Sequence, residues 1–387
     1  MGEEQRSVED LLDTVRFLSQ EIGPRLSASP AERRAAEHVA GRLRTAGFEV
    51  SVEPFQGLIT FSLPYGLICT GCVLATLLYA IQPMASFGLA LLSLAAFLTE
   101  NHTWPTLSHL LPKGLSQNVV GVRPAQGEAV CRVILTAHLD SSKAALLFHP
   151  KLVPGLRRSF LLMVGAMGAT VGLSLIALFA RLGWLWYVQL ACALYLGLSL
   201  SLLLHRELLM KHTPGANDNA SGVAVLLEAA ERLSDLRSTE LWAVATGCEE
   251  SGLDGMLAFM DAHSFDRENT YFINLDNLGA GRVAYISAEG MLRVYPSAPE
   301  LVRLAAETVG EEDLDIHQCP FHSLTTDALV PLVRGYKAMS IMAFDRHGLL
   351  PHWHWPTDTV ENVEPATMET ALRLLCGLVR RLDAEVQ

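Results

Sequence analysis

The chain has 387 residues, of which 50% are hydrophobic and only 18% are charged, and its formal net charge is -12 at pH 7. This length suits one large α/β domain with insertions or two average domains. The negative charge argues against a nucleic-acid-binding protein, because phosphate neutralisation requires clustered Lys and Arg. The high hydrophobic fraction indicates a membrane component instead.

The cysteines and the N-terminus bear on the compartment. Seven scattered cysteines without regular spacing are typical of a reducing compartment. Cys69 and Cys72 form a C-x-x-C inside an apolar run, so we interpret them as small residues of a membrane helix and not as a redox or metal site. The N-terminal sequence is acidic and amphipathic and has no apolar signal-peptide region. Membrane segments are therefore expected inside the chain.

The first fifty residues predict two amphipathic helices. Apolar residues recur at helical spacing between Ser7 and Val50. Ser29, which precedes Pro30, is placed to cap the second helix, and Gly47 is placed to end it. The sequence FEVSVEPF that follows predicts a strand.

Residues 58–99 predict a first membrane hairpin. The run 58–81 contains no ionisable side chain and is long enough for a bilayer core, which takes about 20 residues. Gln82 and Pro83 interrupt it, and the run continues from Met84 to Leu98 at a length that is marginal for crossing. We therefore expect the second arm to be the shorter one.

Residues 157–205 predict a second and clearer hairpin, with one arm from Ser159 to Ala180 and another from Trp184 to Leu204. The aromatic residues after its tip are placed like interfacial anchors. Buried or dimer-forming helices of a soluble protein are the alternative, although four apolar runs exceed the needs of an ordinary core. A transporter ranks last, because almost no charges lie within the runs.

Charges around the second hairpin predict the orientation. An even number of crossings returns the chain to one side of the membrane. On that side lie Lys151, Arg157, Arg158, Arg206 and Lys211. Arg181 alone lies at the tip, so the remaining domain is expected to face the cytoplasm of an integral, multi-pass membrane protein.

The rest of the chain, residues 1–57, 116–150 and 212–387, predicts one catalytic domain. Its strand-like runs are Cys131–Thr136, Leu241–Thr246, Tyr271–Leu275 and Met339–Phe344. They alternate with helical stretches at 222–233, 252–262, 300–309 and 365–382. This pattern predicts a three-layer α/β/α sandwich with a mixed, mostly parallel sheet, whose site lies at the strand ends.

Imidazole and carboxylate side chains follow these strands. His138 and Asp140 come directly after the first strand, and Asp218 lies in a turn rich in Gly and Asn that opens a helix. Taken singly, such residues are equally compatible with a turn or a helix cap.

Further carboxylates and imidazoles follow in the second half. Glu249 and Glu250 are adjacent after the strand LWAVATG, and adjacent carboxylates repel unless a proton or cation separates them. Asp276 ends the strand YFINLD, and His354 precedes the last helix. A set of His, Asp, Glu, Asp and His suits two Zn²⁺ ions bridged by a carboxylate.

In order and local sequence these segments resemble the dizinc exopeptidases of metallopeptidase family twenty-eight, which includes bacterial aminopeptidases, glutamate carboxypeptidases and, with altered metal use, glutaminyl cyclases. The resemblance covers the chain outside the apolar blocks and implies a phosphorylase/hydrolase-like fold. It implies that His138 and Asp276 bind one zinc ion and that Asp218 bridges to a second one.

The same resemblance implies the remaining roles. Glu250 and His354 would bind the second zinc, and Asp140 would orient His138. Glu249 would be the general base that takes a proton from the metal-bound water and passes it to the leaving amine.

Three points stay open on the sequence alone. Asp358 is either a positioning group for His354 or its loop, or part of a helix N-cap region. His352 competes with His354, which we prefer because His-x-Pro-x-Asp-Thr fits the family spacing. The segment 326–328 reads Thr-Asp-Ala where the family often has Ser-Asp-His, which puts its role in substrate binding in doubt.

The sequence thus predicts a membrane-anchored dizinc metallopeptidase, an aminopeptidase-like exopeptidase. Its expected partners are the lipid bilayer and a peptide or acyl-amino-acid substrate, hydrophobic or membrane-associated because both apolar blocks flank the site segments. Alternatives are a non-peptidase amidohydrolase, a glutaminyl-cyclase-like enzyme on the same scaffold, and a catalytically silent membrane binding protein. The residue preference and the oligomeric state stay unknown.

Overall fold

The computed structural model describes residues 3–180 and 182–386. The chain divides into two compact units, each assembled from separate stretches of sequence. The sheet unit comprises Met1–Ile59, Lys113–Ala144 and His212–Gln387. The helical unit comprises Thr60–Pro112 and Ala145–Lys211. Each is described by itself.

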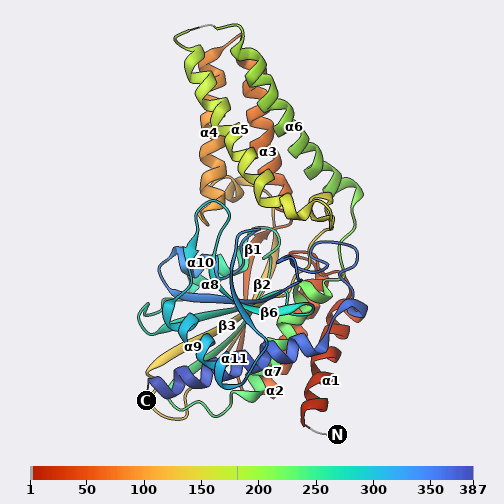
Figure 1. The fold of residues 1–387 in the computed structure, drawn as a ribbon, viewed down its shortest axis with the longest axis vertical. Coiled ribbons are helices and arrows are strands. Elements are labelled where there is room, and N and C mark those ends of the chain that lie inside the picture. Colours follow the sequence, from red (N-terminus) through yellow and green to blue (C-terminus); the bar gives the residue numbers. More distant parts are fainter. Residues whose placement is uncertain (1–2, 181, 387) are drawn as a thin grey trace. The chain divides into compact units, whose positions relative to one another are not determined.

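A mixed sheet forms the middle of the sheet unit (Figure 1). Its strands are β1 (Glu49–Leu58), β2 (Lys113–Arg123), β3 (Cys131–His138), β4 (Thr239–Thr246), β5 (Thr270–Leu275), β6 (Arg282–Glu289), β7 (Tyr295–Pro296), β8 (His317–Phe321) and β9 (Lys337–Phe344). In the described ranges their order is β1-β2-β4-β3-β5-β9-β6-β7, and β8 pairs with β6. The central strands β4, β3, β5 and β9 are parallel, whereas β1, β2, β6 and β7 make antiparallel pairs.

Helices cover both faces of the sheet. One face carries α1 (Glu3–Arg16), α2 (Pro30–Thr45), α7 (Gly222–Arg232), α9 (Pro299–Glu311) and α11 (Pro365–Glu385). The other carries α8 (Asp254–Ala262) and α10 (Leu329–Val333). Side chains of a strand alternate between faces, so Val133 and Leu135 of β3 join the first core and Ile134 joins the second. The predicted three-layer sandwich is confirmed.

Shorter turns complete the sheet unit. They are η1 (Phe17–Ile22), η5 (Ala216–Ser221) and η6 (Val360–Asn362). Ser29 caps α2 as predicted, because its hydroxyl accepts a hydrogen bond from the Glu32 N–H at 3.2 Å. Gly47, which follows α2, has a φ of 86° that suits glycine.

The four predicted strands correspond to β3, β4, β5 and β9, and FEVSVEPF lies in β1. Strands β2, β6, β7 and β8 were not predicted. Because β3, β4 and β5 run parallel, their carboxyl ends meet at one edge of the sheet. His138 lies at the end of β3, and Asp276 follows β5 directly.

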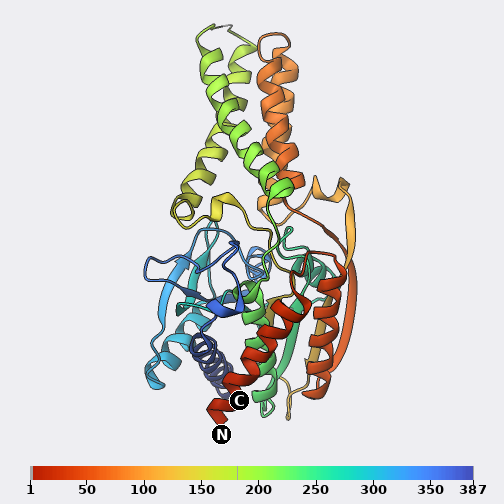
Figure 2. The same ribbon diagram turned by 90° about the vertical axis from the view of Figure 1, so that its right-hand side faces the viewer.

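The helical unit consists of two hairpins that pack together (Figure 2). One is formed by α3 (Ser62–Leu78) and α4 (Pro83–Asn101), the other by α5 (Leu156–Ala177) and α6 (Leu185–Leu209). Short turns η2 (Ser108–Leu110), η3 (Leu146–Phe148) and η4 (Val153–Gly155) lie in the connecting segments. Ser86 of α4 and Ser174 of α5 join the hairpins through hydroxyl oxygens 2.8 Å apart.

Within residues 3–180 and 182–386, three helical segments are long and apolar enough to cross a membrane: Pro83–Asn101, Val153–Ala177 and Leu185–Leu209. The helix Ser62–Leu78 has only 17 residues and is the shorter arm of its hairpin. Our expectation that the second arm is shorter was wrong. Leu58 belongs to strand β1, and α4 continues past Leu98 through polar residues to Asn101.

Candidate metal centre

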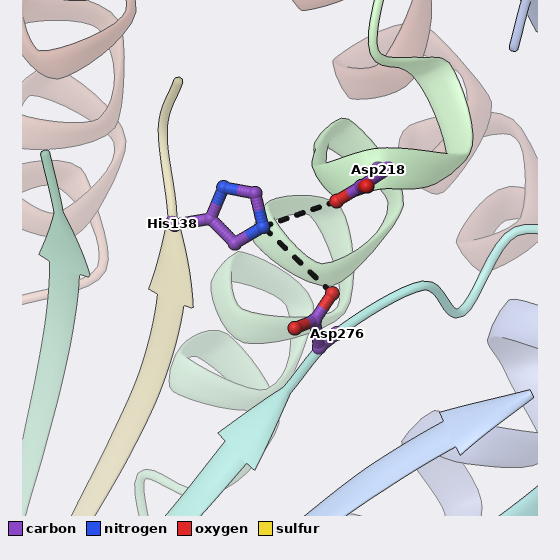
Figure 3. Close-up of side chains that lie close together, drawn as sticks. All are labelled: His138, Asp218 and Asp276. Carbon is purple, nitrogen blue, oxygen red and sulfur yellow. Dashed lines mark ion pairs between the residues drawn. The ribbon is translucent and has the colours of Figure 1, made fainter. Parts of the chain in front are cut away.

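His138 faces two carboxylates at the edge of the sheet (Figure 3). Its Nε2 lies 3.1 Å from Asp218 Oδ1 and 3.7 Å from Asp276 Oδ1. Its Nδ1 lies 3.1 Å from the main-chain oxygen of Asp140. A carbonyl oxygen only accepts, so Nδ1 donates a hydrogen to it, which leaves Nε2 facing the two carboxylates. If Nε2 carries no hydrogen, its lone pair points at two anions. A cation between these atoms removes that repulsion.

A second group shares Asp218. His354 Nε2 lies 3.0 Å from Asp218 Oδ2 and 3.1 Å from Glu250 Oε2. Zinc–ligand distances of about 2.0–2.2 Å in a tetrahedral site place neighbouring ligand atoms roughly 3.3 Å apart. The four nitrogen–oxygen distances, 3.0–3.7 Å, are close to this spacing, and both groups have the nitrogen and oxygen donors that zinc accepts. The residues present therefore fit a metal ion in each group.

Turn η5 explains how Asp218 reaches both groups. Inside this turn Asp218 and Asn219 depart from helical backbone angles, and α7 begins only at Gly222. The departure directs the Asp218 carboxylate toward the strand ends. The predicted turn that opens a helix is present here.

The carboxylates and imidazoles of the site shift each other's pKa values toward the charged forms. Burial alone would lower the pKa of each imidazole, but Glu249 and other carboxylates raise the pKa of His138 well above its usual value. Mainly Glu250 and Asp218 raise the pKa of His354 to about 9. Burial would raise the pKa of Asp218, but hydrogen bonds from both histidines hold it far below the usual range. The site therefore demands positive charge at both positions, which imidazolium or a metal dication can supply.

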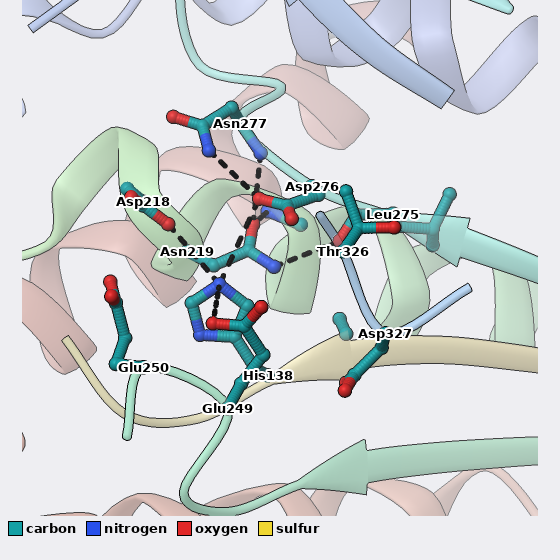
Figure 4. A network of polar contacts seen from close by, with 12 residues as sticks. His138, Asp218, Asn219, Glu249, Glu250, Leu275, Asp276, Asn277, Thr326 and Asp327 are labelled. Carbon is teal, nitrogen blue, oxygen red and sulfur yellow. Dashed lines mark hydrogen bonds and ion pairs between the residues drawn. The ribbon is translucent and has the colours of Figure 1, made fainter. Parts of the chain in front are cut away.

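Glu249 lies beside the first group (Figure 4). Its Oε2 is 4.0 Å from His138 Nε2, and its side chain is 11% exposed. Burial, followed by the charges of neighbouring carboxylates such as Glu250, raises its pKa well above the ordinary glutamate value despite the opposing effect of His138. A carboxyl group in this position beside a metal-ligand group can accept and return a proton.

Asp140 supports the glutamate turn more directly than it supports His138. Its carboxylate accepts the N–H groups of Glu249 and Glu250, each at 3.1 Å, and the hydroxyl of Ser27 at 2.7 Å. Its Oδ1 is 3.6 Å from His138 Nδ1, so the histidine is held mainly through the Asp140 main-chain oxygen. Asp140 thereby fixes the backbone that carries Glu249 and Glu250.

Three asparagines brace the aspartates. The Asn277 amide donates to Asp276 Oδ1 at 2.8 Å, and the Asn217 amide donates to Asn277 Oδ1 at 3.2 Å. Asn219 donates to the Leu275 carbonyl at 2.8 Å, next to Asp276 (Figure 4). These amides restrict the directions in which Asp276 can point and tie its strand end to the residues on either side of Asp218.

The structure also places the residues that stayed open. Asp358 accepts the N–H groups of Asn217 at 2.6 Å and Asp218 at 3.3 Å, so it supports the loop of Asp218 and not His354. Burial raises its pKa to about 7. His352 lies outside both groups, with Nδ1 2.8 Å from the Thr357 hydroxyl.

Segment 326–328 reaches the site through Asp327, whose carboxylate accepts the Thr246 hydroxyl at 2.5 Å. Burial raises the pKa of Asp327 to about 7. The charge of Asp327 also raises the pKa of Glu249. Compared with Ser-Asp-His, this segment therefore keeps the carboxylate, at Asp327, and has Ala328 in place of the histidine.

Sequence reasoning missed several supporting residues. They are Arg25, Ser27, Glu32, Asn217, Asn219 and Asn277. The asparagines are direct sequence neighbours of the predicted ligands Asp218 and Asp276, so this adjacency could have marked them as supporting residues. Arg25, Ser27 and Glu32 lie more than a hundred residues before the groups they support, and no local pattern marks them.

The chain is similar to known peptidases. Residues 204–379 match the sequence model of Peptidase family M28. Aminopeptidase YwaD of Bacillus subtilis (strain 168) is 29% identical over 183 residues, which are 43% of this chain and 37% of that protein. The match thus spans little more than a third of the relative's length.

Solved structures share the fold. A zinc aminopeptidase from Bacillus subtilis aligns with a TM-score of 0.58 and 16% identity, covering 97% of this chain and 95% of that one. A glutaminyl cyclase from Bacteroides thetaiotaomicron aligns with a TM-score of 0.57 and 14% identity, covering 96% and 97%. Together the sequence matches and the shared fold confirm the predicted resemblance of this chain to peptidase family M28.

Proposed function

We propose that the chain is a membrane-anchored dizinc metallopeptidase that hydrolyses an amide bond as an aminopeptidase-like exopeptidase. The observation that carries this proposal is the Asp218 carboxylate, which reaches both histidines through its two oxygens. A shared carboxylate between two similar donor groups suits a pair of metal ions. Its resemblance to peptidase family M28 supports zinc as the metal.

Each residue has a distinct part in the proposal. His138 and Asp276 hold one zinc, Glu250 and His354 hold the other, and Asp218 contributes to both. When bound, zinc would lower the pKa of a bound water to about 7 and polarise the substrate carbonyl.

Proton transfer falls to Glu249. Its carboxylate would accept the proton of the attacking water at Oε2, the oxygen on the His138 side, while the water oxygen bonds to the substrate carbonyl carbon. It would return that proton to the amine as the C–N bond breaks. Asp140 holds the main chain of Glu249 by accepting its N–H group. The Glu249 carboxylate therefore keeps its position relative to His138 during the proton transfer.

The helical unit is proposed to anchor the enzyme in a bilayer. The candidate spans and the apolar side chains exposed along them support this, since lipid tails can solvate such surfaces. The basic residues near the ends of the second hairpin support a cytoplasmic position of the sheet unit. The proposed substrate is a peptide or acyl-amino acid of hydrophobic or membrane-associated character.

A second candidate is a cyclase or another amidohydrolase on the same scaffold. The fold shared with a glutaminyl cyclase supports this second candidate. A glutaminyl cyclase forms a ring with loss of ammonia, whereas a peptidase consumes water, so product analysis separates the two. The third candidate is a catalytically silent binding protein. It would bind zinc through the same five residues and turn over none of the substrates.

The test uses the full chain purified in detergent. Zinc is counted by elemental analysis in the wild type, in Glu249→Gln and in the exposed control Glu37→Gln. Hydrolysis and cyclisation are measured on aminoacyl amides, acyl-amino acids and glutaminyl peptides. We expect about two zinc ions per chain in all three proteins and a loss of hydrolysis of roughly 10²–10⁴-fold in Glu249→Gln alone. A wild type without zinc contradicts the proposal.

A further inference from the structure

Arg25 is a fully buried cation in the loop that follows η1. Only 1% of its surface is exposed. Burial lowers its pKa to about 10, so the guanidinium remains charged at neutral pH. A buried charge of this kind is costly unless its donors are bound, and an arginine offers five N–H groups in a rigid fork.

The donors of Arg25 bind main-chain carbonyls. Nε donates to Leu139 O at 2.7 Å, and Nη2 donates to Gly215 O at 2.8 Å. Nη1 donates to Pro214 O at 2.8 Å and to Leu18 O at 2.9 Å. None of these bonds reaches a carboxylate, although the charges of Asp358, Asp140, Asp218 and Glu250 act on the guanidinium.

Three of the bound carbonyls, those of Leu139, Pro214 and Gly215, belong to the two segments that carry metal-ligand candidates. Leu139 directly follows His138, and Gly215 lies three residues before Asp218. In the sequence these segments are separated by the whole second insertion, which the chain enters after Ala144 and leaves at His212. A single side chain therefore bridges the gap that the insertion opens.

Other contacts tie the same segments at the same place. The Thr213 N–H donates to Ser142 O at 2.9 Å, and the Ser141 hydroxyl donates to Thr213 O at 3.0 Å. The Arg25 main-chain N–H donates to the Ser141 hydroxyl at 3.0 Å. Arg25 thus lies within a closed ring of hydrogen bonds in the sheet unit.

The backbone at Gly215 is fitted to this arrangement. Its φ is 66°, and a Cβ there would lie 2.8 Å from the Arg25 Nη2 and 2.5 Å from the Ser141 Cβ. Only glycine leaves room for the guanidinium at this position.

We propose that Arg25 is a positioning residue of the metal centre. Its guanidinium fixes the distance between the segment of His138 and the segment of Asp218. Metal affinity depends on such pre-organisation, because a metal that has to order its own ligands loses part of its binding free energy. The inference rests on the proposed zinc function, and it concerns Arg25, which lies outside residues 204–379 that match the peptidase family.

The experiment compares the zinc dissociation constants of full-length variants by competition with a chromophoric chelator. Arg25→Lys keeps the charge and loses the planar fork, and we expect its zinc affinity to fall by about 10–100-fold. The matched control is Arg123→Lys. Arg123 also binds carbonyls, those of Ala46 and Leu233, on segments without candidate ligands. We expect wild-type zinc affinity in this control.

The melting temperature of the metal-free proteins shows whether each variant folds. If Arg25→Lys does not fold, Arg25→Gln decides, because it removes the guanidinium fork together with the buried charge and keeps amide N–H donors. A fall in zinc affinity there, with a melting temperature like that of Arg123→Lys, supports the inference. Zinc affinity within twofold of the wild type in the folded variants overturns it, while the proposed function stands. Absence of zinc from the wild type overturns both.

Discussion

The two units use apolar side chains in opposite ways. In the sheet unit the strands bury them on both faces, as with Leu135 and Ile134, which are fully covered by helices. In the helical unit large apolar side chains point outward along the helices; Leu92 is 70% exposed and Leu194 is 68% exposed. The first pattern is that of a core in water. The second is that of a surface whose favourable solvent is hydrocarbon.

The units also differ in how they use buried polar groups. In the sheet unit such groups converge on the candidate metal ligands, as the amide of Asn277 does on Asp276. In the helical unit they join helices, as Ser86 does with Ser174. Burial of polar atoms thus positions chemistry in one unit and associates helices in the other. The predictions below test this difference.

The largest effect is expected at Asp218. Asp218→Asn weakens both donor groups at once, so zinc binding should be lost and activity should fall by roughly 10³-fold or more. Recovery of the variant in the membrane fraction should not change, because the substitution is confined to the sheet unit. Elemental analysis measures the zinc content, and a hydrolysis assay measures the activity. The control is Asp266→Asn, because Asp266 is exposed. Full zinc content in Asp218→Asn would refute the assignment of a shared ligand.

The next effect distinguishes lipid from water as the solvent of the helical unit. Leu198 lies in the middle of α6 and is 56% exposed. Leu198→Lys should cost about 2.5–3.5 kcal/mol of insertion free energy at the centre of a membrane helix. The comparison is Leu115→Lys in the sheet unit, which is 51% exposed and should change stability by about 0.5 kcal/mol or less. The yield of membrane-integrated protein after carbonate extraction is the measurement, and equal yields would contradict membrane insertion.

A buried carboxyl of the sheet unit should make its stability depend on pH. Glu289 accepts the Thr326 and Ser340 hydroxyls, and burial raises its pKa to about 7 despite these bonds. A folded-state pKa above the unfolded value contributes stability that is complete below about pH 4.5 and is lost as the pH rises through about 7.

The test is Glu289→Gln, which stays neutral at every pH. Relative to the wild type it should gain up to about 3 kcal/mol between pH 5 and pH 8. Unfolding monitored by tryptophan fluorescence at both pH values gives this difference. The exposed Glu37→Gln variant should follow the wild type. Parallel pH dependence of Glu289→Gln and wild type would show that Glu289 is ionised in the folded protein.

The smallest effect compares a single hydroxyl in each unit. Ser86→Ala removes the bond to Ser174 in the helical unit and should cost about 0.6 kcal/mol, the average for polar contacts between membrane helices. Ser29→Ala removes the cap of α2 in the sheet unit and should cost about 1 kcal/mol. Denaturant titration of each variant measures both. A cost at Ser86 well above that at Ser29 would mean that hydroxyl contacts contribute more to the helical unit than expected.

Prediction from sequence succeeded where the pattern is local. The central strands are apolar throughout, and Ser29 with Pro30 marks a helix start, so both could be recognised. Strand β2 was missed because it carries Ser116, Gln117 and Asn118, which are polar but buried where the strand pairs with β1. The first hairpin was misjudged because hydropathy does not separate a strand end from a helix.

The same distinction holds for the site. Three candidate ligands, His138, Glu250 and Asp276, lie at or just after strand ends, and all five could be read in order along the sequence. The support by Asp140 of the Glu249–Glu250 turn, and by Asp358 of the Asp218 loop, joins residues more than a hundred positions apart. No periodicity or motif encodes such contacts, because they depend on the order of strands in the sheet.

Both insertions start and finish at neighbouring backbone positions. Leu58 is the register partner of Lys113, and Ser142 accepts a hydrogen bond from the N–H of Thr213. Each insertion therefore occupies the place of a short turn. In evolutionary terms, a pair of helices can be gained or removed at either position while the strand order and the ligand geometry stay the same. The same two positions are therefore natural points for grafting other segments onto the sheet unit.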